Sequence, residues 1–158
     1  MKNTIVTYLV ILSGLIFFAG CEKNESTTIK VIEGQIFNEI KAHRIDNGIS
    51  SDAPFVHQFI MVKEAQLFSA KMAYGTGGLD TTGISAHWDM IHDKIGGYND
   101  LTLIQATSQT SAADIVGNWT NDSTISAMML DEFSQCGVGV EYGNDNVAYV
   151  TVLMMLID

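Results

Sequence analysis

The sequence predicts an α+β fold in which helices cover both faces of a small, mainly antiparallel sheet, a three-layer α-β-α sandwich. Apolar residues recur at helical spacing through the first half of the chain and alternate with a period of two near its end. Segment 147–157 is almost wholly apolar, as is typical of a central strand that is covered on both faces. With 47% hydrophobic residues and one proline, the chain is expected to bury a dense core.

The N-terminal segment, residues 1–20, has the pattern of a secretory signal peptide. Lys2 is followed by an apolar stretch, and the small residues Ala19 and Gly20 stand directly before Cys21. This ending resembles the bacterial lipobox, which implies cleavage before Cys21 and acylation of its thiol, although Phe18 stands where the lipobox usually has leucine. We therefore expect a bacterial cell-envelope protein that the lipid on Cys21 anchors to the periplasmic side or the cell surface.

Two other interpretations of this segment remain open: an ordinary signal peptide, and an N-terminal membrane anchor. The anchor is disfavoured because the charged stretch 22–25 follows Cys21 and no second apolar span comes after it. Residues 21–30 are polar and lack periodicity, which predicts a tether, and residues 31–158 are expected to form the domain.

Composition limits the partners of the mature chain. Removing the first 20 of the 158 residues leaves 138, the size of one domain. They carry 7 basic and 18 acidic residues, a formal net charge of −11, which excludes nucleic acid as a partner and a basic patch as the membrane attachment. If Cys21 carries lipid, Cys136 has no partner for an intramolecular disulfide.

The helical half of the chain is expected to contain three helices. Residues 33–74 hold two of them, separated by the stop signal Asn47-Gly48, with Ser51-Asp52 as the cap of the second. A glycine-rich loop over 75–83 leads to the third, over 85–95.

The second half mixes strands and helices. A short strand over 101–105 precedes a helix that Ser111 caps and that carries Trp119, and Asp122 opens another helical segment. A hairpin over 138–157 turns at 143–146.

Four segments, in this order, resemble the CAP superfamily, which includes cysteine-rich secretory, antigen 5 and pathogenesis-related proteins. They are the helix at 36–48 with Asn38-Glu39, Arg44 and Asn47-Gly48, the helix at 65–73, the helix at 114–123 with Trp119, and the strand Gly137-Val138-Gly139-Val140. The resemblance implies a CAP-like domain over nearly all of residues 33–157.

The residues that carry the chemistry of the family are mostly replaced. CAP domains typically hold a divalent metal with two histidines and two glutamates, and the matching positions here are Asp80 or Thr81, Thr102 or Leu103, Asp122, and Ile125. Asp122 is the ligand that survives, whereas a tight transition-metal site needs three or four ligands. We therefore expect no metal, no cofactor and no enzymatic activity. The reshaped cleft is expected to bind an unknown small molecule, lipid or protein through Thr81, Thr102, Trp119, Asp122 and Ile125.

The densest cluster of ionisable side chains lies at 87–93, where His87 and His92 accompany Asp89 and Asp93. Residues five apart point to different sides of a helix, so the two imidazoles are not expected to chelate one ion, and the segment is interpreted as a solvated helix face. One alternative is an envelope hydrolase with an unrecognised site around His87, His92 and Asp122. Another is a structural or inhibitory lipoprotein with a filled cleft.

Overall fold

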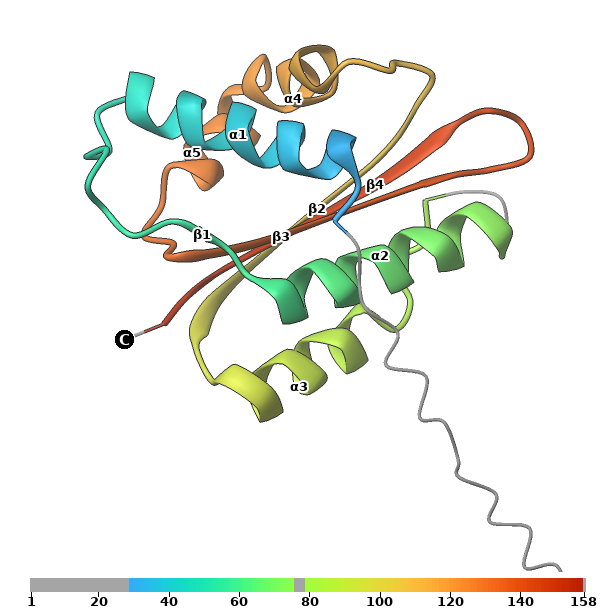
Figure 1. The fold of residues 1–158 in the computed structure, drawn as a ribbon, viewed down its shortest axis with the longest axis horizontal. Coiled ribbons are helices and arrows are strands. Elements are labelled where there is room, and N and C mark those ends of the chain that lie inside the picture. Colours follow the sequence, from blue (N-terminus) through green and yellow to red (C-terminus); the bar gives the residue numbers. More distant parts are fainter. Residues whose placement is uncertain (1–28, 76–78, 158) are drawn as a thin grey trace, which may run out of the picture.

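Helices cover both faces of a four-stranded sheet in the computed structural model, which describes residues 29–75 and 79–157 (Figure 1). The predicted signal peptide, Cys21 and the tether up to residue 28 lie outside the described residues. The elements are α1 Val31–Asp46, β1 Val56–His57, α2 Phe59–Tyr74, α3 Ile84–Ile95, β2 Tyr98–Thr107, α4 Ala112–Thr120, α5 Ser123–Met129, β3 Gln135–Tyr142 and β4 Ala148–Leu156. Of the helices in this part of the chain, none is long and apolar enough to cross a membrane.

The sheet has the strand order β1-β3-β4-β2, and it is antiparallel except for the pairing of β1 with β3. Strand β4 is central: it pairs with β2 on one side and with β3 on the other, and all but its last residue are buried. This position explains why segment 147–157 contains almost no polar residues. The predicted α+β class, with a mainly antiparallel sheet between two helical layers, is confirmed.

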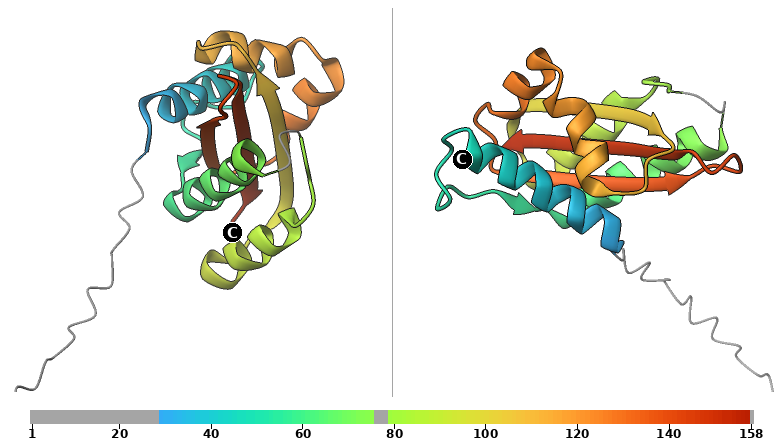
Figure 2. Two further views of the ribbon diagram at one scale, coloured as in Figure 1. Left: turned by 90° about the vertical axis from the view of Figure 1, so that its right-hand side faces the viewer. Right: turned by 90° about the horizontal axis from the view of Figure 1, so that it is seen from above.

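The two faces of the sheet are covered by different helices, as both views in Figure 2 show. Helices α1, α4 and α5 pack on the face that carries Val138, Val150 and Val152. Helices α2 and α3 pack on the other face, against Leu153 and Met155. Because side chains alternate along a strand, neighbouring residues of β2 and β4 belong to opposite layers of the core.

Two of the predicted helix starts are confirmed by their caps. The hydroxyl of Ser111 accepts a hydrogen bond from the backbone N–H of Asp114 at 3.1 Å. The carboxylate of Asp122 accepts the backbone N–H groups of Thr124 at 2.9 Å and Ile125 at 3.1 Å. Each cap satisfies amide groups that have no partner inside the helix.

The predicted start of the second helix is wrong. Ser51-Asp52 does not cap it; α2 begins at Phe59, after the short strand β1. The backbone N–H of Val56 donates to the carbonyl of Ser134, and that of Gln58 donates to the carbonyl of Cys136. Pairing with β3 therefore holds this segment extended, and it overrides the local signal for a helix.

The free edge of β3 is closed by the start of α1. Strand β1 pairs with β3 only as far as Cys136, so Val140 has no strand beside it on that edge. The fully buried carboxylate of Glu33 accepts the backbone N–H of Val140 at 3.0 Å, and the ammonium of Lys30 donates to the carbonyl of Val140. We call this pair of contacts the Lys30–Glu33 clasp. It takes the place of a neighbouring strand.

Candidate functional site

The five residues of the expected cleft do not come together. Thr102 faces the layer of α2 and α3, where its hydroxyl accepts the indole N–H of Trp88 at 2.9 Å. Trp119 is 4% exposed and packs in the core on the opposite face of the sheet, with Ile125 against the same cluster. The carboxylate of Asp122 is used as the cap of α5. Thr81 is exposed in the segment that leads to α3.

The two histidines of α3 are held in separate pairs. His87 Nδ1 lies 2.8 Å from Glu64 Oε2, and the ring of His87 meets the ring of Phe68 edge to face. His92 Nε2 lies 2.8 Å from Asp100 Oδ2, and this hydrogen bond raises the pKa of His92. The solvated-face interpretation thus fails for His87, whose partner Glu64 is buried. Since Asp122 lies across the sheet, the residues of the hydrolase alternative do not form one site.

A serine–histidine contact that sequence reasoning missed joins α1 to α5. His43 Nε2 lies 3.0 Å from the hydroxyl of Ser126, and His43 Nδ1 lies 3.3 Å from the side-chain amide of Asn47. The backbone N–H of Ser126 donates to the carbonyl of Asp122, so it does not serve as an oxyanion donor. Without an acid on the second ring nitrogen, this contact is interpreted as a link between two helices.

The side chains that could bind a metal ion do not cluster in the described part of the chain. Within residues 29–75 and 79–157, no group of three or more histidine, cysteine, aspartate or glutamate residues is placed to hold a metal ion. Cys136 is fully buried, and burial raises the pKa of its thiol. It therefore packs as a small apolar side chain and does not react as a thiolate.

A depression of about 260 Å³ next to Arg44 is lined largely by apolar side chains, among them Ile49, Pro54 and Phe133. Arg44 is 3% exposed, and burial lowers the pKa of its guanidinium. It donates to three main-chain carbonyls, those of Met129 at 2.6 Å, Asp131 at 3.0 Å and Phe133 at 3.1 Å. These bonds fix the segment between α5 and β3, which gives Arg44 a structural role.

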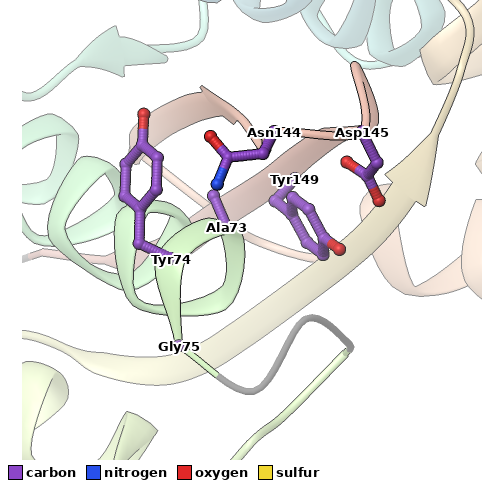
Figure 3. Close-up of a pocket in the computed structure, with 6 residues that line it drawn as sticks. All are labelled: Ala73, Tyr74, Gly75, Asn144, Asp145 and Tyr149. Carbon is purple, nitrogen blue, oxygen red and sulfur yellow. The ribbon is translucent and has the colours of Figure 1, made fainter.

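A more polar depression, of about 320 Å³, lies between the end of α2 and the turn that joins β3 to β4 (Figure 3). Its lining residues are Ala73, Tyr74 and Gly75 from the end of α2, Asn144 and Asp145 from the turn, and Tyr149 from β4. In Figure 3, Tyr74 stands on the α2 side, Asp145 and Tyr149 stand on the hairpin side, and Asn144 lies between them. We call this depression the hairpin pocket.

The polar groups of the hairpin pocket are only partly used by the protein. The hydroxyl of Tyr74 donates to Glu141 Oε1 at 2.9 Å, which raises the pKa of Tyr74 and keeps the phenol neutral. Asp145 Oδ1 accepts the backbone N–H of Val147 at 3.1 Å, which holds the turn. Among the described residues, the side-chain amide of Asn144 and the hydroxyl of Tyr149 make no hydrogen bond, so both are available to a ligand.

Comparisons with known proteins identify the fold. No family model and no curated protein matches the chain. An outer surface protein from Borrelia burgdorferi has a similar structure, with a TM-score of 0.61 and 18% sequence identity over 83% of this chain and 96% of that chain. A cysteine-rich secretory protein from Staphylococcus aureus matches with a TM-score of 0.59 and 11% identity, over 81% of this chain and 40% of that chain. The described domain thus has a CAP-like fold.

Proposed function

We propose that this chain is a lipid-anchored protein of the bacterial cell envelope, and that its CAP-like domain is a binding module without catalytic activity. The observation that carries the binding role is the hairpin pocket, where the side chains of Asn144, Asp145 and Tyr149 line a depression of about 320 Å³. Ligand sites are typically such concave surfaces with a few polar groups that fix the orientation of the ligand.

The absence of catalysis is supported by the way the ionisable residues pair. His87 and His92 are each bonded to a different carboxylate, and Asp122 caps a helix on the other side of the sheet. A general base has to reach the proton that it removes, together with a nucleophile and a group that stabilises the developing charge. The described residues offer no place where these three roles meet.

The anchor and the location are supported by sequence and by fold analogy. Cys21 follows Ala19-Gly20 at the end of the apolar N-terminal stretch, and the two similar structures carry the names of an outer surface protein and a secretory protein. The structural or inhibitory alternative would work through an apolar surface. Phe59 and Leu67, each about half exposed on α2, are the residues through which it would act.

Replacing Cys21 by serine tests the anchor. Wild-type protein is expected in the membrane fraction, with a mass that corresponds to a chain starting at an acylated Cys21, whereas Cys21→Ser should be uncleaved by the lipoprotein peptidase or be released without lipid. The matched control is Cys136→Ser, which leaves the N-terminal segment intact. Mass spectrometry of membrane-extracted wild-type protein that finds an unmodified Cys21 would overturn the anchor.

A further inference from the structure

The charges that line the hairpin pocket are all negative. It lies at the end of the 16-residue helix α2, where the helix dipole places partial negative charge, and Asp145 adds an exposed carboxylate. Its lining contains no lysine, arginine or histidine. The chain as a whole has a formal net charge of −10. An anionic ligand would be repelled here, and a cationic one attracted.

Two lysines belong to or contact the elements that form the pocket, and both have other partners. The ammonium of Lys30 lies 2.8 Å from Glu141 Oε2, so the same carboxylate that accepts the Tyr74 hydroxyl is already neutralised. The ammonium of Lys71 donates to the carbonyl of Thr82 and lies 5.8 Å from the ring centre of Phe68. Asp145 is therefore the lining residue whose charge a ligand would meet.

One tyrosine ring, that of Tyr74, is exposed at the pocket. Tyr74 is 62% exposed, whereas the ring of Tyr149 is buried against Phe68 and Met72, with the residue 3% exposed. Aromatic rings attract cations through their electron-rich faces, by about 0.5–1 kcal/mol at exposed sites and more where water is excluded. A metal ion is a poor fit, because no group of three metal-binding side chains lies within the described residues.

From the partial negative charge at the end of α2, the carboxylate of Asp145 and the exposed ring of Tyr74, we infer that the hairpin pocket binds a small alkylammonium group. This inference deepens the proposed binding role and rests on it. The ammonium lies near Asp145 and against Tyr74, while the amide of Asn144 and the hydroxyl of Tyr149 meet the polar part of the ligand. The carboxylate of Asp145 selects a positively charged ligand, and the ring of Tyr74 favours a weakly hydrated, alkylated cation over a metal ion.

The test is a titration of the ¹⁵N-labelled domain with choline and, in parallel, with 3,3-dimethylbutan-1-ol, which has the same shape without the charge. Choline is expected to shift the side-chain amide signal of Asn144 and the backbone signal of Gly75, and to bind at least about threefold more tightly than the neutral alcohol. Equal affinity for both probes would overturn the alkylammonium class and leave the pocket as a binding site. No shift at these residues with either probe would overturn the alkylammonium inference together with the assignment of the hairpin pocket as the binding site.

Variants of Asp145 and Tyr74 separate the contribution of the carboxylate to binding from that of the ring. Asp145→Asn keeps the oxygen that accepts the N–H of Val147 but removes the charge, and it should weaken choline binding about threefold. Tyr74→Leu should weaken it by a similar factor, whereas Tyr74→Phe keeps the ring and should bind as the wild type does. The control is Asp93→Asn, a carboxylate on α3 whose side chain is 72% exposed, which should change nothing. Unchanged binding by Asp145→Asn would contradict the inference.

Discussion

Glu33 shows how a single buried residue holds several elements of this domain. Its side chain has no exposed surface, and its carboxylate accepts hydrogen bonds from the backbone of Lys30 at 2.8 Å, from the side chain of Gln66 at 2.7 Å and from the backbone of Val140 at 3.0 Å. These donors belong to the segment before α1, to α2 and to β3. One carboxylate thus ties a helix on each face of the sheet to the edge of the sheet.

Glu33→Ala should destabilise the domain by about 1–3 kcal/mol, because the buried backbone N–H of Val140 loses its acceptor and an unsatisfied buried group costs about this much. Urea denaturation followed by circular dichroism measures the loss. Glu39→Ala, which removes an exposed carboxylate from the same helix, is the control and should change stability by less than about 0.5 kcal/mol. Similar denaturation midpoints for the two variants would contradict the role of Glu33.

His92 stabilises the folded domain more at low pH than at high pH. Its hydrogen bond to Asp100 raises its folded-state pKa above the ordinary value of about 6.5, so the folded state binds the proton more tightly than the unfolded state does. The resulting stability is fully present below the unfolded pKa, and it is lost as the pH rises through the folded pKa. The wild type should therefore have a larger free energy of unfolding than His92→Gln at pH about 5.5. This difference in free energy should be smaller at pH about 8.5.

The measurement is the urea midpoint of both proteins at the two pH values. In an Asp100→Asn background this difference in stability should depend less on pH, since the hydrogen bond that contributes most to the raised pKa of His92 is weakened and the partner charge is gone. If the difference in stability between the wild type and His92→Gln is the same at both pH values, the pair of His92 and Asp100 makes no contribution to stability that depends on protonation.

At the scale of elements, the contact between α2 and β3 depends on two glycines. A Cβ atom at Gly137 would overlap the main chain of Met61, and one at Gly139 would overlap the main chain of Ala65. The helix therefore lies directly on the backbone of the strand. The hydroxyl of Ser69 uses this closeness to donate to the carbonyl of Gly139 at 2.9 Å.

Gly139→Ala should destabilise the domain by about 3 kcal/mol, the upper end of the usual cost of overpacking, because main-chain atoms cannot move aside as a flexible side chain can. Gly34→Ala is the matched control: an added Cβ there meets nothing within 4 Å, and alanine favours the helix. Denaturation in urea should show a lower midpoint for the first variant and an unchanged or higher midpoint for the second. Equal midpoints would mean that α2 can shift away from β3 at little cost.

At the scale of the whole molecule, the sequence predicts those features that depend on local pattern. The apolar run of β4 indicates its central place in the sheet, and Ser111 and Asp122 mark the starts of α4 and α5. The strand at Val56–His57 has no such local signal, because its hydrogen bonds come from residues nearly 80 positions later in the chain.

The candidate site could not be predicted from local sequence patterns for a similar reason. The hairpin pocket joins Tyr74 to Asp145, which are far apart in the sequence and meet only when α2 packs on the hairpin. The expected cleft, in contrast, rests on resemblance to a family whose metal ligands are mostly replaced in this chain. Thr102 and Trp119 lie on opposite faces of the sheet, so resemblance located the elements correctly but not a shared site.

The Lys30–Glu33 clasp has a mechanical consequence. The described domain begins at Ile29 and Lys30, so a force applied through the N-terminal segment reaches Lys30 before it reaches α1. There it is shared between the ammonium contacts to Val140 and Glu141 and the carboxylate of Glu33, which passes it to β3. The load thus enters the sheet at β3, which is paired with β4 from Gln135 to Tyr142, and does not peel α1 from its end. A domain held by its N-terminus would resist being pulled open at the point where it is held.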